Sequence, residues 1–306
     1  MPTALQASQA AQELQSQSSH AWEESRQPDA HRYAVLGNPV AHSRSPAIHA
    51  RFAAQTGQAI VYEKMLVPLG EFSEAVAGFI AAGGHGANVT VPFKLEAYAL
   101  ADHLSERAAA AGAVNTLRFK SGQIFGDNTD GIGLVTDLTA NAGIDLQGRR
   151  ILLVGAGGAA QGVILPLLGM QPAQLVIANR TASKAHDVAA RFTSQATSQV
   201  LEVCTLEALD GAFDVVINAT AASLDDAVPM IPTTVFRSHT LAYDMMYGRE
   251  PTAFMRFAAG HGAAVRDGLG MLVEQAAESF LIWRAVRPET ASVLAMLRKA
   301  LQNETA

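Results

Sequence analysis

Several polar side chains in the N-terminal half follow predicted strands, where a buried core would hold apolar residues. They are Ser43, Ser45, Thr90, Lys94, Asn115 and Asp130. Hydroxyls, an amide, an amine and a carboxylate gathered in one place can bind a small acid that carries several hydroxyl groups. Each residue taken alone also has an ordinary explanation as a helix cap, a turn residue or a solvated charge. The set as a whole favours a site for a polyhydroxylated acid.

Lys94 and Asp130 add the chemistry of a proton transfer. A ketone that accepts a hydride becomes an alkoxide, and an ammonium group can donate the proton that it needs. A carboxylate beside the amine can orient it and hydrogen-bond to the same hydroxyl. This chemistry requires no metal ion, and the sequence has a single cysteine, Cys204, and no HExxH motif. We therefore expect no metal site and no intrachain disulfide.

A glycine-rich segment, ILLVGAGGAAQGVILPLL, has the pattern of a dinucleotide-binding turn. Gly155, Gly157 and Ala160 fit the frame G-x-G-x-x-[GA] between a predicted strand and a predicted helix. Gly155 permits the tight turn, Gly157 lets the backbone approach a pyrophosphate, and Ala160 keeps helix and strand close. The helix N-terminus attracts the phosphates. A glycine-rich turn without a ligand is the alternative, and the strand–turn–helix context favours the dinucleotide.

The end of the next predicted strand indicates which nicotinamide cofactor is bound. An NAD site would place Asp or Glu there for the ribose hydroxyls. This chain instead has Asn179, Arg180 and Thr181, with Lys184 one turn further. Two cations at this position suit the 2′-phosphate of NADP, which Arg180 can bind through two donors. Solvated charges at a helix start are the alternative, but cations there oppose the helix dipole and need an anion.

Short apolar runs alternate with segments of helical period along most of the chain. Strands are predicted at 33–36, 60–67, 87–91, 114–119, 123–125, 151–154, 175–178, 201–204, 215–218, 241–243 and 263–265. Helices are predicted at 45–57, 71–82, 94–102, 105–111, 132–143, 159–168, 183–192, 269–285 and 291–301, with Ser45 as the N-cap of the first. Repeated strand–helix–strand crossovers predict an α/β fold with parallel sheets and helices on both faces. The 306 residues suggest two domains, at ~150 residues each.

The composition excludes several classes of partner. A net charge of −6 gives no basic stripe for nucleic acid. No apolar run approaches the ~20 residues that span a bilayer, and no basic start precedes an apolar stretch as in a secretory signal. We expect no nucleic acid and no membrane partner, and a cytoplasmic enzyme. Residues 1–30 are rich in Ala, Gln and Ser, and we interpret them as a disordered tail.

The sequence resembles the shikimate dehydrogenase family from about Tyr33 to the C-terminus. The motifs that carry the resemblance follow in order: GNPVAHSRSPAIHA, NVTVPFK, GAVNT, GDNTDG, VGAGGAA, NRT, YDMMY and GLGMLVEQAA. The resemblance implies reversible reduction of 3-dehydroshikimate to shikimate with NADPH, in the pathway to chorismate and the aromatic amino acids. It also implies a monomer or a homodimer.

The resemblance assigns roles to individual residues. Lys94 and Asp130 would form the catalytic pair, and Ser43 and Ser45 would bind the substrate carboxylate. The ring hydroxyls would be held by four residues, with Tyr247 nearby: Thr90, Asn115, Asp130 and Gln275. The cofactor would be held by Glu106, Gly155, Ala156, Gly157, Gly158, Ala159, Asn179, Arg180, Thr181, Ala182, Ser183, Lys184, Met245 and Gly268.

The family fold implies an N-terminal α/β domain for substrate and a Rossmann-type domain for the dinucleotide. We expect the substrate domain at 31–131 plus 268–306, because the C-terminal helices return to it, and the NADP domain at 132–267. One departure lies after the strand ending at Asn218. The family has a Thr-Ser step followed by Gly there, and this chain has Thr220, Ala221, Ala222 and Ser223. The departure falls in the loop beside the nicotinamide, so it concerns cofactor fit more than the chemistry.

Two alternatives remain. A quinate or shikimate dehydrogenase that uses NAD would carry an acidic residue where Arg180 stands. A non-catalytic relative that binds shikimate or NADP would be favoured if Lys94 or Asp130 were absent, and both are present.

Overall fold

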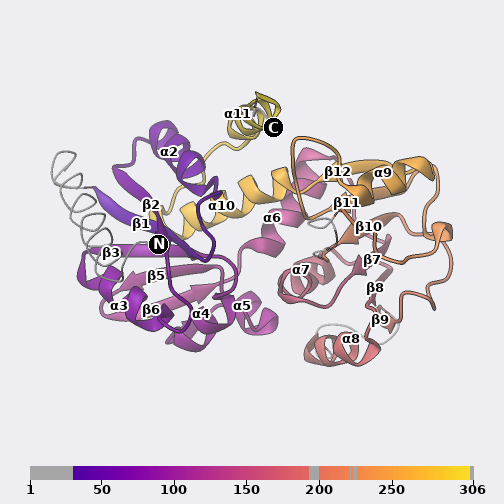
Figure 1. Ribbon diagram of the computed structural model, residues 1–306, viewed down its shortest axis with the longest axis horizontal. Coiled ribbons are helices and arrows are strands. Elements are labelled where there is room, and N and C mark those ends of the chain that lie inside the picture. The colour runs from indigo at the N-terminus through magenta and orange to yellow at the C-terminus, as the bar shows by residue number, and fades with distance from the viewer. Residues whose placement is uncertain (1–29, 193–199, 221, 223–225, 304–306) are drawn as a thin grey trace, which may run out of the picture.

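The computed structural model describes residues 30–192, 200–220, 222 and 226–303. The predicted tail lies outside the described residues except for its last residue. Ala221 and Ser223, which carry the departure from the family pattern, also lie outside them. Two lobes, each built on one sheet, lie side by side with α6 and α10 between them (Figure 1).

The first lobe contains a six-stranded mixed sheet. Its strands lie in the order β2 (Ile60–Leu66), β1 (His31–Gly37), β3 (Gly84–Val89), β5 (Thr116–Lys120), β6 (Gln123–Asp127) and β4 (His103–Leu104). The pairs β1–β2 and β1–β3 are parallel, whereas β3–β5 and β5–β6 are antiparallel. The parallel pairing predicted from the crossovers therefore holds for β1 with its two neighbours and not for β5. The turn at Ser121 and Gly122, with positive φ angles of 53° and 75°, reverses the chain between β5 and β6.

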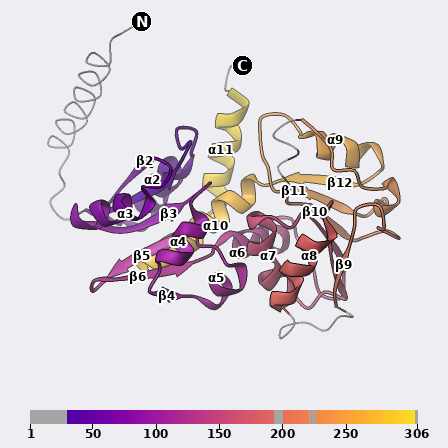
Figure 2. The same ribbon diagram turned by 60° about the horizontal axis from the view of Figure 1, so that its bottom comes forward.

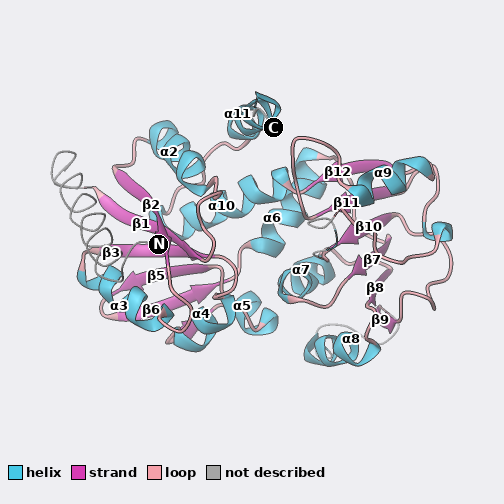
Figure 3. Ribbon diagram, viewed as in Figure 1, coloured by secondary structure: helices cyan, strands magenta, loops and turns pink. Residues whose placement is uncertain are grey.

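Helices cover both faces of this sheet (Figure 3). On one face, α3 (Phe72–Ala81) and α4 (Lys94–Leu100) bury apolar side chains against β1 and β3, and α5 (Glu106–Ala111) completes this layer. On the other face, α2 (Ser45–Thr56) packs Ile48 and Phe52 against Phe280. Phe52 and Phe280 have no exposed surface, and each such ring contributes about 1.5–3 kcal/mol of transfer free energy.

The second lobe contains a six-stranded, fully parallel sheet. Its strands lie in the order β12 (Ala264–Asp267), β11 (Leu241–Asp244), β10 (Val215–Asn218), β7 (Arg150–Val154), β8 (Gln174–Ala178) and β9 (Leu201–Cys204). Alternate residues of β7 enter different cores. Ile151 and Leu153 pack with α7 (Gly158–Gly169) and α8 (Ala182–Ala189), and Leu152 and Val154 pack with α9 (Ala253–Gly260). This is the doubly wound arrangement that binds ligands at the carboxyl ends of its strands.

Two helices connect the lobes and pack closely against each other (Figure 2). They are α6 (Asp130–Thr136), which continues as a π-helical turn over Asp137–Asn141, and α10 (Leu269–Arg284). A Cβ atom on Gly133 of α6 would lie 2.7 Å from the backbone oxygen of Met271, so only glycine allows this approach. None of the residues of α10 is exposed, whereas α11 (Ala291–Asn303) exposes one side to solvent.

The structure corrects one prediction of local structure and adds one helix that was not predicted. The N-cap of α2 is Arg44, without a side-chain cap, and Ser45 is the first helical residue. The added helix is α9. Its signal is Thr252, whose hydroxyl accepts a hydrogen bond from the Met255 N–H. No helix in the described ranges is long and apolar enough to cross a membrane.

Candidate active site

A cavity of 390 Å³ opens where the two lobes meet. Eight residues predicted for substrate binding line it: Ser43, Ser45, Thr90, Lys94, Asn115, Asp130, Tyr247 and Gln275. Met245 and Gly268, predicted for the cofactor, also line it. The cavity therefore brings the predicted substrate residues together beside two of the predicted cofactor residues.

The ends of several elements position these side chains. Ser43 and Ser45 follow β1, and the Ser45 N–H donates to Ser43 Oγ at 3.3 Å. Thr90 follows β3, and its backbone N–H donates to the Leu36 oxygen, which fixes this loop at the sheet edge. Gln275 reaches the cavity from α10. Parallel strands that end at one edge create such a crevice.

Lys94 and Asp130 form an ion pair in the wall of the cavity. Lys94 Nζ lies 2.6 Å from Asp130 Oδ2, and the two side chains are 25% and 12% exposed. Lys94 begins α4 and Asp130 begins α6, so two helix starts bring the charges together. The pair is accessible to a ligand yet largely shielded from water, which strengthens its electrostatic interactions.

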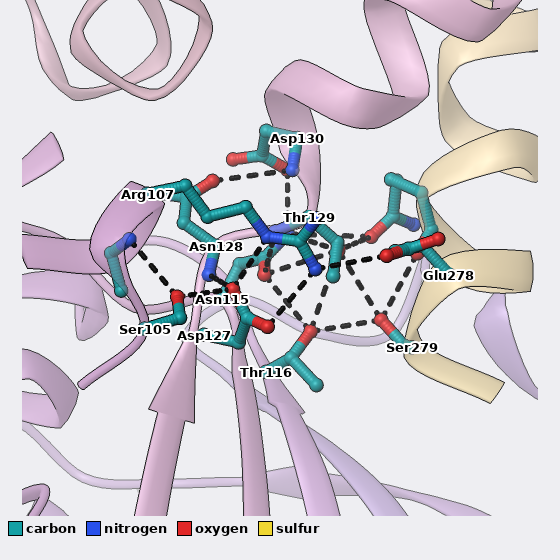
Figure 4. A network of polar contacts seen from close by, with 12 residues as sticks. Ser105, Arg107, Asn115, Thr116, Asp127, Asn128, Thr129, Asp130, Glu278 and Ser279 are labelled. Carbon is teal, nitrogen blue, oxygen red and sulfur yellow. Dashed lines mark hydrogen bonds and ion pairs between the residues drawn. The ribbon is translucent and has the colours of Figure 1, made fainter. Parts of the chain in front are cut away.

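Asn115 holds the other oxygen of this carboxylate. Its Nδ2 donates to Asp130 Oδ1 at 2.7 Å, and its Oδ1 accepts from the Thr129 N–H at 2.9 Å. Figure 4 shows Asn115 and Thr129 within a group of polar side chains below Asp130. Asp130 is thus fixed by one donor on each oxygen, as a proton-transfer partner of Lys94 requires.

A layer of buried polar side chains lies beneath the cavity and was not predicted from the sequence. Its members are Asn88, Thr116, Asn128, Thr129 and Ser279. Asn88 lines the cavity, and Tyr62 donates to Asn88 Oδ1 at 2.7 Å. Burial raises the pKa of the Tyr62 hydroxyl, and the Ser45 side chain acts in the opposite direction. Four members lie inside motifs already noted, NVTVPFK, GAVNT and GDNTDG, so their polar type was a signal.

The remaining lining residues of the cavity were also missed. They are Val35, Pro39, Val40, His42, Arg44, Val89, Met271 and Leu272. Most are apolar, and an apolar side chain in a sequence cannot be told from a core residue before the cavity is seen.

The glycine-rich turn between β7 and α7 has the geometry that the sequence predicts. Gly155 has a φ of 114°, and a Cβ on it would lie 3.2 Å from Thr220 Cγ2. Gly157 and Gly158 have open space around them, and they form the start of α7 with Ala159. Exposed backbone at a helix N-terminus can bind a phosphate group.

A second cavity, of 370 Å³, lies at the ends of β7, β8 and β10. Gly155, Asn179 and Arg180 line it, and Glu207 lines it without having been predicted. Asn179 Nδ2 donates to the Thr181 oxygen at 2.9 Å, at the start of α8 with Ala182 and Ser183. Arg180 and Lys184 are exposed, and neither has a carboxylate within ion-pair distance in the part of the chain that the structure describes. Arg180, a cation in the cavity wall without a carboxylate partner there, suits a phosphate group, and Lys184 lies outside the lining.

The other predicted cofactor residues differ in position. The Gly268 N–H donates to the Met246 oxygen at 3.0 Å, which joins the loops after β11 and β12. Ala156 is partly buried in the glycine-rich turn. Glu106 begins α5, is exposed and lines neither of the two cavities. The structure does not bring Glu106 into the site.

No group of three or more His, Cys, Asp or Glu residues that could hold a metal ion occurs within residues 30–192, 200–220, 222 and 226–303.

Family models match three parts of the chain. The shikimate dehydrogenase substrate-binding domain matches residues 35–117, shikimate / quinate 5-dehydrogenase matches 137–226, and the shikimate 5′-dehydrogenase C-terminal domain matches 268–298. A protein of Janthinobacterium sp. (strain Marseille) named shikimate dehydrogenase (NADP(+)) is 66% identical over 269 residues, which cover 88% of this chain and 97% of that protein.

Solved structures agree with this match over the same length. The Ael1 enzyme from Pseudomonas putida has a TM-score of 0.83 and 46% identity, and the match covers 88% of this chain and 98% of the other. Shikimate 5-dehydrogenase from Thermus thermophilus, solved with NADP(H) and shikimate, has a TM-score of 0.79 and 34% identity, with coverages of 89% and 100%. The chain belongs to the shikimate dehydrogenase family.

Proposed function

We propose that this chain catalyses the reversible, NADPH-dependent reduction of 3-dehydroshikimate to shikimate in the cytoplasm, on the way to chorismate and the aromatic amino acids. The observation that carries the proposal is the Lys94–Asp130 ion pair in a cavity lined by hydroxyl and amide groups. The 66% identity to a shikimate dehydrogenase (NADP(+)) supports the same substrate and cofactor.

The two lobes correspond to two proposed domains. Residues 31–131 and 268–306 form the substrate-binding domain, and residues 132–267 form the NADP-binding domain. The position of α10 supports this division, because it packs against α2 and β3 of the first lobe after the chain leaves β12.

The substrate would lie in the 390 Å³ cavity with its carboxylate near Ser43 and Ser45. Serine hydroxyls and a backbone N–H can donate to a carboxylate without another charge. Thr90, Asn115 and Gln275 would bind the ring hydroxyls, with Tyr247 beside them.

The cofactor site fits NADP on the residues present. The open turn at Gly155–Ala159 would hold the pyrophosphate, and Asn179–Lys184 would hold the ribose 2′-phosphate through Arg180 and Lys184. Met245 and Gly268 would contact the nicotinamide end, because they line the substrate cavity. Glu106 remains a proposal that the resemblance alone supports. When bound, NADPH supplies the hydride for the reduction.

The residues of the chain manage the proton. Lys94 donates a proton from Nζ to the substrate oxygen as negative charge develops there. Asp130 accepts hydrogen bonds from Lys94 and from the substrate hydroxyl that forms, and so orients both groups for the transfer. In the oxidative direction the proton moves from the hydroxyl to Lys94. The position of the cavity between two lobes allows water to be excluded when they close.

An assay of the purified chain tests the proposal. We expect NADP⁺-dependent oxidation of shikimate, and Lys94→Ala should lower kcat by roughly 10²–10⁴-fold with a much smaller change in the KM for shikimate. Lys120→Ala, at an exposed position of the hairpin, is the matched control and should keep wild-type rates. Near-normal turnover by Lys94→Ala would remove that residue from the mechanism.

The same assay separates the alternatives. Quinate with NAD⁺ is the second substrate pair to be tested, because the matched family model covers shikimate and quinate enzymes. Faster turnover of quinate with NAD⁺ than of shikimate with NADP⁺ would show that the proposed substrate and cofactor are wrong. Binding of shikimate or NADP⁺ without turnover would indicate a non-catalytic relative.

A further inference from the structure

A chain of buried hydrogen bonds runs from the edge strand β2 to Asp130. Tyr62 Oη donates to Asn88 Oδ1 at 2.7 Å, and Asn88 Nδ2 donates to Thr116 Oγ1 at 3.2 Å. Thr116 Oγ1 donates to Asn115 Oδ1 at 2.9 Å, and Asn115 Nδ2 donates to Asp130 Oδ1 at 2.7 Å. Asn88 and Thr116 are opposite residues of the antiparallel pair β3–β5, so the sheet itself sets this contact.

The amide of Asn88 has only one favourable orientation. Its Nδ2 lies 3.3 Å from the backbone oxygen of Asn115, which can only accept a hydrogen bond. A flipped amide would place two oxygens against each other there. Asn88 Oδ1 must therefore point to Tyr62, whose hydroxyl is its donor.

The amide of Asn115 is fixed by the same reasoning. The backbone N–H of Thr129 can only donate, and it lies 2.9 Å from Asn115 Oδ1. The carboxylate of Asp130 can only accept, and it lies against Nδ2. The two asparagine amides thus donate in the same direction along this series of hydrogen bonds.

The hydroxyls between the amides can adopt an arrangement of protons that completes the chain. Ser279 Oγ donates to the backbone oxygen of Gln275 at 3.0 Å, which leaves its lone pairs free to accept from Asn88 Nδ2 at 3.0 Å. Thr116 Oγ1 lies 2.8 Å from Ser279 Oγ and 2.9 Å from Asn115 Oδ1, and its proton completes the chain when it is donated to Asn115. Thr116 and Ser279 have no exposed surface, so water does not compete with this arrangement.

We propose that Tyr62, Asn88 and Thr116 are positioning residues that orient Asn115 and, through it, the Asp130 carboxylate for proton transfer with Lys94. Every donor in this chain points toward Asp130. Hydrogen bonds aligned in one direction polarise and strengthen one another, and the low dielectric of the interior increases the effect. Tyr62 and Thr116 do not line the cavity, so they act only through their neighbours. The proposal rests on the proposed function for its effect on rate, but its hydrogen bonds can be tested without activity.

Thr116 allows a test with conservative variants. Thr116→Val removes the hydroxyl at nearly constant shape, and we expect kcat for shikimate oxidation to fall about 5–20-fold, because one hydrogen bond is lost and the acid–base pair shifts. The KM for shikimate should change less than about threefold, since the groups that line the cavity remain. Thr116→Ser restores the donor and should recover at least half of the wild-type kcat. Tyr62→Phe should lower kcat in the same way, by a smaller factor.

Thr240→Val is the matched control in the other lobe. Thr240 is also fully buried, and its hydroxyl donates to the Phe213 oxygen at 2.6 Å. This variant should lose stability as Thr116→Val does and keep wild-type kcat. Equal kcat in wild type and Thr116→Val, or an equal loss in Thr116→Ser and Thr116→Val, would overturn the proposal.

The side-chain amide signals of ¹⁵N-labelled protein give a readout that does not depend on activity. Thr116→Val should shift the Asn115 side-chain signals and speed their exchange with water, whereas Thr240→Val should leave them unchanged. Unchanged Asn115 signals in Thr116→Val would also overturn the proposal. Absence of shikimate oxidation by the wild type would instead count against the proposed function.

Discussion

His49 is expected to make the fold sensitive to mild acid. Its side chain has no exposed surface, it stacks on Tyr62 with ring centroids 4.3 Å apart, and neither ring nitrogen has a hydrogen bond of good geometry within the described residues. Burial lowers the pKa of His49 from 6.5 to about 3, with the nearby Asn88 side chain opposing the shift. His49 is thus neutral in the folded protein over the whole physiological range.

The sign and size of the effect follow from these two pKa values. Below pH 6.5 the unfolded chain binds a proton at His49 that the folded chain does not, so the free energy of unfolding decreases as the pH falls. The loss grows to about 2 kcal/mol at pH 5 and to roughly 5 kcal/mol at pH 3 and below, at ~1.4 kcal/mol per unit. Well above pH 6.5, His49 is neutral in both the folded and the unfolded chain, and its titration costs no stability.

Urea unfolding at pH 8 and pH 5 measures this loss, and His49→Leu isolates it from other titrating groups. The variant should match wild type at pH 8 within about 1.5 kcal/mol, because leucine has a similar volume and no polar atom to desolvate. Its loss between pH 8 and pH 5 should be smaller than that of wild type by about 2 kcal/mol. His239→Leu, at an exposed position, should keep the wild-type pH dependence. An equal pH dependence in wild type and His49→Leu would refute the assignment to His49.

Three substitutions test other parts of the structure. In binding titrations, Arg180→Ala should weaken the binding of NADP⁺ by about 10–100-fold and barely change the binding of NAD⁺, because only NADP⁺ has the 2′-phosphate. Equal losses of affinity for both cofactors would mean that Arg180 supports the loop. Arg266→Met should reduce the free energy of unfolding, measured in urea, by about 3–5 kcal/mol. The substitution removes the guanidinium that donates to both oxygens of the fully buried Asp137, at 2.5 and 2.9 Å. A loss below about 1 kcal/mol would contradict this. Gly268→Ala should raise the KM for NADP⁺ and lower kcat, because the new Cβ would lie 2.1 Å from the Met245 backbone oxygen; wild-type kinetics would mean that the two loops separate freely.

The sequence predicted the α/β fold, most helices and strands, and the polar residues Ser43, Ser45, Thr90, Lys94, Asn115 and Asp130 that meet in the main cavity. The glycine frame at Gly155 and the polar residues at strand ends have types that a core would not hold. Tyr247, Gln275, Met245 and Gly268 were predicted only from the resemblance to the family. The strand pair around Ser121 and Gly122 was also predicted, and it forms the β5–β6 hairpin. The antiparallel pairing of β5 with β3 was missed, since periodicity identifies strands but not their direction.

Other parts of the site depend on contacts between distant residues. Asn88 and Ser279 are 191 positions apart, and their hydrogen bond of 3.0 Å exists only because α10 returns to β3. The ordering of donors from Tyr62 to Asp130 likewise follows from three-dimensional neighbours. Such a chain has no local signature, because each member alone is an ordinary polar residue.

The enclosure of α10 between the lobes has a consequence for how this protein can evolve. One side of the helix faces the cavity with Gln275, another pairs with α6, and the rest packs with Phe280 in the core. A substitution anywhere along its 16 residues therefore meets a neighbour. In a saturation mutagenesis screen for growth without aromatic amino acids, α10 should tolerate the fewest substitutions of any helix, and α11 should tolerate many on its solvent side. We expect natural variation that tunes the enzyme to fall in the loops around the cavity rather than in this helix.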